Sequence, residues 1–422
     1  MNFTTTSVAM RVLSVAFDVS SESLNWSLEV GETRQDGVCA NETDSIRKTL
    51  TDIKRIADKR GFSEVRVICE STGIYHRSLL RIAGGLGMRT NLVHGEAVSK
   101  YRTIQFADHG KTDSKDPQAI LTVAKVGRLI KHRELDSRYT QLRELHRLVL
   151  RLERRKRAAK NELHADLRSL FPDLRLAKSV LYGPTGRALI DQFGANPTKI
   201  ISAGLDMFGG QIKSQSKYTK RATLKRIWQS GQASMTQQPD PGVAEIQEHG
   251  VRQLYSEIAC FSEQIAELEL KMQAIYDELC QRDKRLPRAK KHVVSKRLLA
   301  RLVAEIGPPA DFQTIAQLMR YAGLNLCERQ SGKWRGRTMI SRRGRSEIRY
   351  VLNLMTLPLV GRSKLFGDYY WKKKDDDKMP GEKAITCVMR KILKLFFGWY
   401  RSESDFDQQR VFVMASQYQK AA

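Results

Sequence analysis

The chain has 422 residues, 41% of them hydrophobic, so it can form ordinary cores in two or three domains. It contains 73 Lys and Arg against 46 Asp and Glu, and the net charge of +27 favours binding to nucleic acid or another polyanion. No apolar run approaches the roughly 18 residues of a membrane span, and no signal pattern opens the chain, so we expect a cytoplasmic protein. The six cysteines include no CxxC pair, which excludes a zinc finger.

The first third of the chain alternates predicted strands and helices. Residues 11–18 and 24–30 contain β-branched and aromatic residues in strand patterns, and 36–40 is a shorter candidate. The apolar spacing then predicts, in chain order, a helix at 45–60, a strand at 65–69, a helix at 76–83, a strand at 90–93 and, after a connecting segment, a helix at 114–131. The order βββαβαβα is that of the ribonuclease-H-like nuclease fold.

Four acidic residues lie at the ends of these elements. Asp18 ends the first strand, Glu70 ends the fourth, and Asp113 and Asp116 lie beside the last helix. Each alone has a structural explanation as a turn or cap, strongest for Asp116 because Pro117 follows it. Carboxylates are preferred ligands of Mg²⁺, and two such ions about 3.5–4 Å apart assist displacement at a phosphodiester. Together the four acids predict a metal site for chemistry on a polyanion.

The middle of the chain contains two long helical patterns. One is a heptad seam of Val251, Leu254, Ile258, Phe261, Ile265, Leu268, Met272, Ile275 and Leu279. Residues 142–163 keep the same rhythm, so the two helices can pair as an antiparallel hairpin or with another subunit's copy. A structural stalk is the simplest interpretation. The basic run that interrupts the first pattern can grip phosphates, although such runs are usually solvated faces; it consists of Arg154, Arg155, Lys156 and Arg157.

Two further segments differ in composition. Residues 171–240 are rich in Gly, Pro, Ser and Gln, and 230–242 has the composition of a loop, which predicts a loop-rich insertion. After Pro287 the chain becomes a basic, helical unit in which Ser331 lies between Gln330 and Gly332. A turn or cap role explains this serine, but the surrounding cations would also suit a phosphoryl-transfer nucleophile. These cations are Arg329, Lys333, Arg335, Arg337, Arg342, Arg343 and Arg345.

Four sequence blocks resemble the DEDD transposases of bacterial insertion sequences, the insertion-sequence family numbered 110, which includes pilin-gene invertases. The blocks are Phe17-Asp18-Val19-Ser20, Glu70-Ser71-Thr72-Gly73-Ile74-Tyr75, Lys111-Thr112-Asp113 with Asp116, and Ala322-Gly323-Leu324 through Gln330-Ser331-Gly332 to Arg343-Gly344-Arg345. The resemblance departs at Pro117, where the family usually has Ala, and at 290–295, which lacks a Gly-rich hairpin.

The resemblance implies three domains: a RuvC-like α/β nuclease domain at 1–135, a helical coiled-coil domain at 136–285, and a mainly α transposase domain at 286–422. It implies Mg²⁺ or Mn²⁺ on Asp18, Glu70, Asp113 and Asp116, and Ser331 as nucleophile. The implied partners are double-stranded donor and target DNA and a structured non-coding RNA, the bridge RNA. A homo-oligomer, dimer or tetramer, is also expected.

The expected function is therefore DNA transposition by metal-assisted serine phosphoryl transfer. The 215 positions between Asp116 and Ser331 allow a composite site from two protomers or a hairpin that returns the chain to its own nuclease domain. One alternative is a RuvC-like nuclease or junction resolvase with water as nucleophile. A second is a nucleic-acid-binding protein without catalysis.

Overall fold

The computed structural model describes residues 11–70, 73–106, 115–127, 129–290, 294–328, 330–331, 334–336 and 338–402. The chain forms two compact units, Met1–Glu134 and Leu135–Ala422. The boundary expected after residue 135 lies one residue from this division. The boundary expected at 285/286 falls inside the second unit. Within the described residues, no helix is both long and apolar enough to cross a membrane.

The first unit is built on a six-stranded sheet of order β3-β2-β1-β4-β5-β6. β1, β2 and β3 form an antiparallel meander, and β4 and β5 run parallel to β1. The strands are β1 (Val12–Val19), β2 (Ser23–Val30), β3 (Thr33–Ala40), β4 (Glu64–Glu70), β5 (Arg89–Val93) and β6 (Ile130–Lys131). This strand order and direction are those of the RuvC-like, ribonuclease-H-like fold, as expected from the order of the elements.

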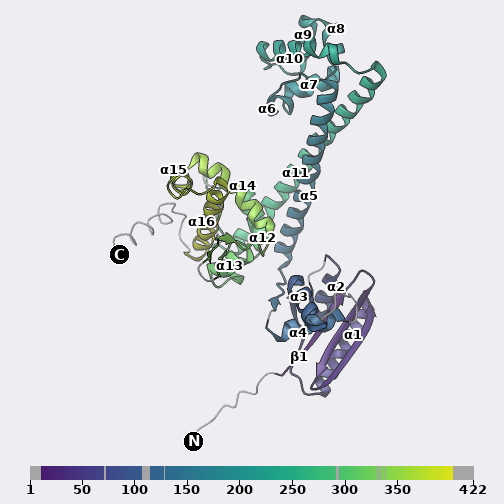
Figure 1. Ribbon diagram of the computed structural model, residues 1–422, viewed down its shortest axis with the longest axis vertical. Coiled ribbons are helices and arrows are strands. Elements are labelled where there is room, and N and C mark those ends of the chain that lie inside the picture. Colours follow the sequence, from purple (N-terminus) through teal and green to yellow (C-terminus); the bar gives the residue numbers. More distant parts are fainter. Residues whose placement is uncertain are drawn as a thin grey trace, which may run out of the picture. The chain divides into compact units, whose positions relative to one another are not determined.

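Helices cover both faces of this sheet (Figure 1). Alternate residues of β1, such as Val15 and Phe17, pack against α1 (Thr43–Lys59) and α2 (His76–Gly85). Ala16 and Ile68 point to the opposite face, where they pack with residues of α3 (Gly95–Phe106) and α4 (Lys115–Lys125). The alternation follows from the two-residue period of a strand. It assigns every residue of β1 and β4 to one of the two faces.

Two predictions in this unit were wrong in detail. The segment expected to connect 93 to 114 contains the helix α3. The helix expected at 114–131 ends at Lys125; Gly127 has φ of 77°, and β6 then pairs antiparallel with β5. A positive φ is easily adopted by glycine, which explains why the helix stops here.

The second unit begins with a stalk of two long helices, α5 (Ser137–Leu170) and α11 (Pro241–Arg282), which lie side by side in Figure 1. Tyr139 near the start of α5 shares a hydrophobic cluster with Leu279 near the end of α11. Leu167 near the end of α5 shares another with Ala244 near the start of α11. The helices therefore run antiparallel within one chain, the first of the two arrangements that the seam allowed. That they supercoil stays a prediction.

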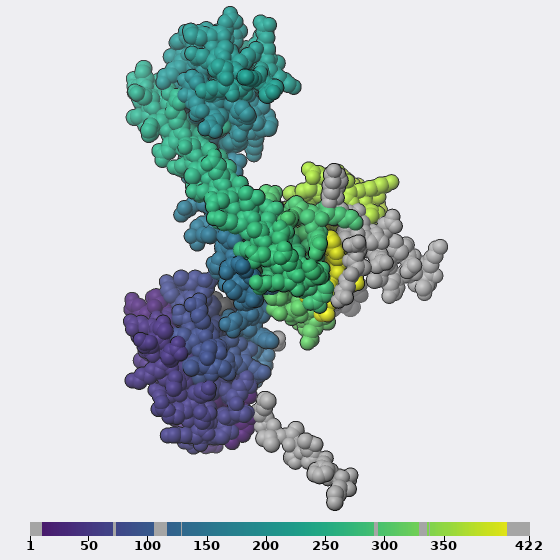
Figure 2. All heavy atoms as spheres, turned by 180° about the vertical axis from the view of Figure 1, so that it is seen from behind, coloured from purple at the N-terminus to yellow at the C-terminus, as the bar shows by residue number. Residues whose placement is uncertain are grey.

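The segment between the stalk helices is helical, so the prediction of a loop-rich insertion was wrong. Figure 2 shows it as a compact cluster of side chains at the end of the stalk. Residues 230–242, expected as a loop, contain the end of one helix, a 3₁₀ turn and the start of α11. The helices of this tip are α6 (Lys178–Leu181), α7 (Pro184–Phe193), α8 (Pro197–Ala203), α9 (Leu205–Gln215), α10 (Arg221–Ser234) and η1 (Met235–Gln237).

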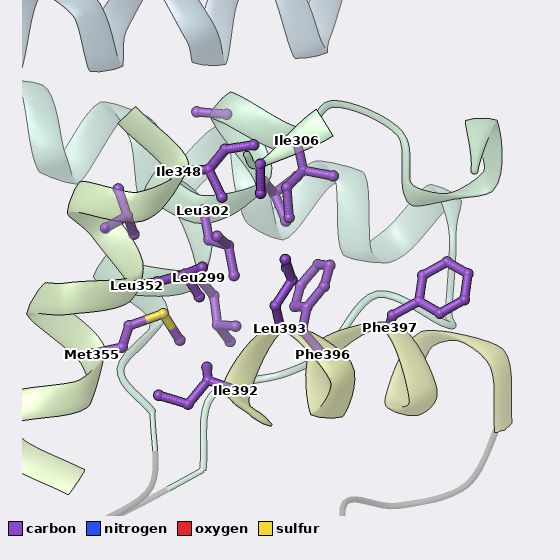
Figure 3. Close-up of a cluster of buried hydrophobic side chains, with 14 of the residues drawn as sticks. Leu299, Leu302, Ile306, Ile348, Leu352, Met355, Ile392, Leu393, Phe396 and Phe397 are labelled. Atoms are coloured by element: carbon purple, nitrogen blue, oxygen red, sulfur yellow. The ribbon is translucent and has the colours of Figure 1, made fainter. Parts of the chain in front are cut away.

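The rest of the second unit is mainly α, as predicted. Its elements are α12 (Lys296–Ile306), η2 (Pro309–Asp311), α13 (Ile315–Tyr321), β7 (Leu326–Cys327), β8 (Gln330–Ser331), β9 (Trp334–Arg335), β10 (Met339–Ile340), α14 (Ser346–Arg362), α15 (Lys364–Trp371), η3 (Lys372–Asp376) and α16 (Gly381–Ser402). Side chains of α12, α14 and α16, such as Leu302, Leu352 and Leu393, point toward one another in its core (Figure 3). The same cluster includes Leu279 of the stalk, so the core is continuous across the expected boundary at 285/286.

A buried arginine joins this core to the stalk. Arg301 of α12 is 2% exposed, and its guanidinium lies 2.9 Å from Glu153 of α5 and 3.5 Å from Glu269 of α11. Tyr350 of α14 donates a hydrogen bond of 3.0 Å to Glu153. Charged side chains are rarely buried unless paired, so this network accounts for a glutamate inside the apolar seam of α11.

Candidate functional site

Asp18 and Glu70 lie on neighbouring parallel strands. The register pairs Phe17 of β1 with Cys69 of β4, so the next position sets Asp18 beside Glu70. Neighbouring strands are about 4.8 Å apart. Ala16 and Ile68, two positions earlier on each strand, face α3 and α4, and the period of two places both acids on that same face.

The first residue of α3 makes room for the Glu70 carboxylate. A Cβ atom on Gly95 would lie 2.2 Å from Oε1 of Glu70, far inside van der Waals contact. Any residue larger than glycine would therefore displace the carboxylate or the helix. The N-terminus of a helix carries partial positive charge, which favours an ionised carboxylate there. The absence of a side chain at Gly95 thus leaves space for the Glu70 carboxylate beside the start of α3.

Asp116 belongs to the first turn of α4, which covers the same face of the sheet. It is 6% exposed, and Arg102 of α3 donates a hydrogen bond of 2.8 Å to its Oδ1. This ion pair ties α3 to α4. Asp113, the fourth predicted acid, lies outside the described residues. The fold therefore brings Asp18, Glu70 and Asp116 to one face.

The donors on this face suit a hard divalent cation. Carboxylate oxygens are the ligands that Mg²⁺ and Mn²⁺ prefer, and Asp18 and Glu70 supply them from adjacent strands. Among the residues that the structure describes, no three acidic, His or Cys side chains are gathered closely enough to form a metal-binding group. The side chains of Asp18 and Glu70 fit such an ion, and Asp116 shares its Oδ1 with Arg102.

Ser331 lies on a short β arm in the second unit. β7 pairs with β10 and β8 pairs with β9, both antiparallel, and these four strands are here together called the serine arm. Ser331 is the last residue of β8 and pairs with Trp334. Only the backbone of Ser331 is described. A two-stranded arm is marginally stable alone, so its position depends on what holds its base.

Two glycine blocks close the base of the serine arm. Gly323 has φ of 67°, and a Cβ on it would lie 3.0 Å from the carbonyl carbon of Arg342. A Cβ on Gly344 would lie 2.4 Å from the backbone nitrogen of Gly323. The blocks around Gly323 and Gly344 therefore cross backbone to backbone, which requires glycine on both sides. Backbone hydrogen bonds from Ser341 to Asn325 and from Arg342 to Gly323 complete this crossing.

A buried carboxylate anchors the same crossing to the stalk. Glu305 of α12 accepts hydrogen bonds from Arg345 Nε at 3.0 Å and from His146 Nδ1 of α5 at 2.8 Å. Both Glu305 and His146 are fully buried. Burial opposes ionisation of Glu305, but the hydrogen bond from His146 and the charge of Arg345 outweigh it and lower the pKa of this carboxyl to about 2. Arg345, one of the expected DNA contacts, is thus engaged in an ion pair with Glu305.

The other expected contacts to nucleic acid are scattered over the second unit. Arg154, Arg155 and Arg157 of α5 are exposed and Lys156 is half-buried. Arg342 and Arg343 are exposed at the base of the serine arm. The remaining positions have no described side chain; Arg329, Lys333 and Arg337 lie outside the described residues, and for Arg335 only the backbone is described.

Several residues that shape these sites were not identified from the sequence. Three of them act through contacts with residues distant in the sequence: Gly95, Arg102 and Glu305. No local sequence pattern predicts such contacts. Gly323 and Gly344 belong to blocks that had been singled out, but their pairing had not been predicted. The one signal available was that the two blocks lie on either side of the serine in the sequence.

Comparison with known proteins agrees with this organisation. A family model described as "Transposase", for DEDD transposases of the IS110 type, matches residues 15–172. A second, described as "Transposase IS116/IS110/IS902 family", matches residues 292–371. No curated protein matches the chain. The solved structure of T. thermophilus RuvC in complex with Holliday junction substrate is similar at 9% identity, covering 29% of this chain and 100% of that one with a TM-score of 0.22.

The fold assignment rests on the sheet topology described above and not on that likeness. The family assignment rests on the two models, which together cover more than half of the chain and include both the strand with Asp18 and the serine arm. The chain therefore belongs to the IS116/IS110/IS902 family of DNA transposases.

Proposed function

We propose that this transposase cuts and rejoins donor and target DNA through a covalent link to Ser331, with metal-binding acids in its RuvC-like domain and a structured RNA as guide. The observation that carries the metal part is the placement of Asp18 and Glu70 on adjacent strands, facing the helix of Asp116. Divalent ions bound there would neutralise charge on the transferring phosphoryl group. Asp113 is proposed as the fourth ligand.

The serine step conserves the energy of the phosphodiester. The Oγ of Ser331 attacks phosphorus and loses its proton, a phosphoserine ester forms, and the 3′ oxygen leaves and takes up a proton. In the reverse step a 3′-hydroxyl of the other DNA attacks the ester and releases the serine. No bond energy is lost to water, so religation needs no ATP. The exposed cations Arg342 and Arg343, at the base of the serine arm, are proposed to hold the phosphate.

The anchoring of the serine arm supports a role beyond a surface turn. Its base is fixed by the crossing of Gly323 with Gly344 and by the bond from Arg345 to buried Glu305. A nucleophile must be held in a defined geometry, and such supporting contacts provide it.

The first experiment traps the covalent intermediate. A nicked DNA substrate with the cognate RNA and Mg²⁺ should yield a species that survives denaturation and carries one DNA end on the peptide containing Ser331. Ser331→Ala should abolish it, because the attacking oxygen is lost. Asp18→Asn and Glu70→Gln should reduce it strongly while far-ultraviolet circular dichroism stays unchanged, because they remove ligands but not bulk.

Matched controls keep the result specific. Ser346→Ala removes an exposed serine at the start of α14, and Asp36→Asn removes an exposed acid from edge strand β3; both should leave the adduct intact. Cleaved DNA with ordinary hydrolysed ends and no adduct would instead support the nuclease with water as nucleophile. Full adduct formation by Asp18→Asn would refute the metal assignment.

The proposed RNA guidance has its own test. It rests on the family membership and on the net charge of +27, which suits a nucleoprotein complex. Purification from cells that carry the complete insertion sequence should recover one structured RNA encoded by the element, and cutting should depend on it. Recovery of only bulk cellular RNA, with cutting unchanged after ribonuclease treatment, would contradict guidance.

A further inference from the structure

One face of α5 is basic over its second half. Arg157, Lys160, His164 and Arg168 are spaced by three or four residues, so they lie on one side of the helix. The buried residues of this stretch are on another side, and they pack into the core of the tip; they are Ala159, Leu163 and Leu167. We call the four basic residues the basic stripe.

No acid interrupts the basic stripe. At about 100° per residue, Glu162 and Asp166 of the same helix fall on the opposite side. Among the described residues, Arg157, Lys160 and Arg168 form no ion pair with a carboxylate. A surface helix usually mixes charges of both signs, so an unbroken basic side is a specific feature of this segment.

The basic stripe leads into a hollow at the tip that is open to solvent, here called the tip cavity. The cavity has a volume of about 1180 Å³ and lies where α5 ends and α6 begins. His164 and Arg168 line it from the stripe, and Arg175 and Lys178 line it from the following segment. Its apolar wall includes the buried Phe171 and Leu181. Four basic side chains thus converge on one hollow from two successive elements.

A tyrosine organises the edge of this cluster. The Nζ of Lys160 lies 4.2 Å from the centre of the Tyr182 ring, and the Tyr182 hydroxyl is hydrogen-bonded to His164 Nε2 at 3.2 Å. Tyr182 stacks on Tyr255 of α11 with an interplanar angle of 10°. The ring contacts hold two members of the stripe in place on a packed surface.

The positive charges of this cluster act on one another. Burial and the charges of Lys178, Lys160 and Arg168 lower the pKa of His164. Burial and the charges of Lys156 and Lys178 lower the pKa of Lys160. Like charges therefore repel one another here, and an anionic ligand would relieve that repulsion.

We propose that the basic stripe and the tip cavity bind the phosphodiester backbone of a nucleic acid. The stripe from Arg157 to Arg168 is about 16 Å long at ~1.5 Å per residue, and one strand presents a phosphate about every 3.4 Å of its axis, so several phosphates can be contacted at once. The proposal draws on the identity of the protein as a DNA transposase and is independent of the serine chemistry and of RNA guidance.

The test measures the salt dependence of binding. The variant Lys160→Gln, Arg168→Gln, Lys178→Gln removes three positive charges from the stripe and cavity. The matched control Lys217→Gln, Arg221→Gln, Lys225→Gln removes three exposed charges from the same tip, outside the cavity. Full-length proteins are titrated with labelled duplex DNA in one arm and duplex RNA in the other, by fluorescence anisotropy between about 50 and 200 mM salt.

The slope of the logarithm of the DNA-binding constant against the logarithm of salt should become shallower by about 0.9 for each lost phosphate contact, hence by roughly 2–3 for the stripe variant. The control variant should change this slope by less than the roughly 0.9 that one lost phosphate contact gives. A change of slope in only the DNA titration or only the RNA titration identifies which nucleic acid is the ligand. Equal slopes for the stripe variant and the control in both arms would overturn the proposal. Arg168→Glu alone, at an exposed position, should shift binding in the same direction.

Discussion

At the scale of single residues, Glu305 shows how one buried carboxylate links distant parts of the chain. It joins His146 of the stalk to Arg345, which follows the serine arm by five residues in sequence. The pKa of Glu305 is lowered to about 2, below its usual 4.5. A group with a depressed folded-state pKa stabilises the protein above its unfolded pKa and loses that contribution as the pH falls through the folded pKa.

The stability of the second unit should therefore fall as the pH is lowered from about 4.5 toward 2. Each pKa unit corresponds to about 1.4 kcal/mol, so Glu305 contributes on the order of 3 kcal/mol at neutral pH. Urea unfolding from neutral pH to pH 3 should show a smaller pH-dependent loss for Glu305→Gln than for the parent protein. The control Glu263→Gln, on the exposed side of α11, should keep the parent's slope. Parallel curves for the Glu305 variant and the parent would rule out this role.

The sequence identified some site residues and not others for a physical reason. Asp18 and Glu70 were predicted because each ends a strand with a clear apolar pattern, and the fold order then implies that these strands are neighbours. Gly95 and Arg102 were not, because their importance arises from contacts formed only when α3 packs on the sheet. Local patterns identify ligands at strand ends; they do not identify the residues that hold those ligands.

At the scale of helices, the composition of the tip misled the prediction. Pro184, Pro197 and Pro241 each occupy the first turn of a helix, and Gly194 and Gly204 each end one. Proline lacks the N–H that a first turn leaves unpaired, and glycine accepts the conformation that ends a helix. The Gly and Pro residues interpreted as loop composition are therefore the boundaries of short helices.

The Arg301 network gives a prediction about how the helices hold together. Replacing Arg301 with Ala leaves Glu153 and Glu269 without their shared partner in a buried site, which should cost about 3–5 kcal/mol of unfolding free energy. Arg297→Ala, one turn earlier on α12, removes a half-exposed pair to Glu269 and should cost less than about 1 kcal/mol. Urea denaturation of both variants measures the difference. A loss for Arg301→Ala as small as the one expected for Arg297→Ala would contradict a stabilising role of the buried network.

At the scale of the whole molecule, the acids and the serine belong to different compact units. Asp18, Glu70 and Asp116 are in Met1–Glu134, and Ser331 is in Leu135–Ala422. If both act on one phosphate, they come together either in one chain or from two protomers of an oligomer. The sequence predicted both units from separate patterns. It does not say whether the acids and the serine of one active site come from the same protomer or from two.

Mixing two inactive variants should decide this, and we expect complementation between protomers. Asp18→Asn keeps Ser331, and Ser331→Ala keeps the acids, so a composite site from two chains restores one intact combination. The covalent DNA adduct should then form on the chain that carries Asp18→Asn, identified by its mass. Each variant alone provides the control. An inactive mixture, in a sample shown by co-purification of differently tagged chains to contain mixed oligomers, would place the complete site within one chain.

The antiparallel course of the stalk has a consequence for how this protein can change over evolution. Tyr139 and Leu279 meet in one cluster, so the chain enters and leaves the stalk at the same end. The chain between Tyr139 and Leu279, which forms the rest of the stalk and the tip, is therefore an insertion whose two ends lie together in one cluster. Equal numbers of heptads can be added to or removed from both helices without altering the connections of the remaining core. The reach of the tip is thus an adjustable length, free to vary while the chemistry stays fixed.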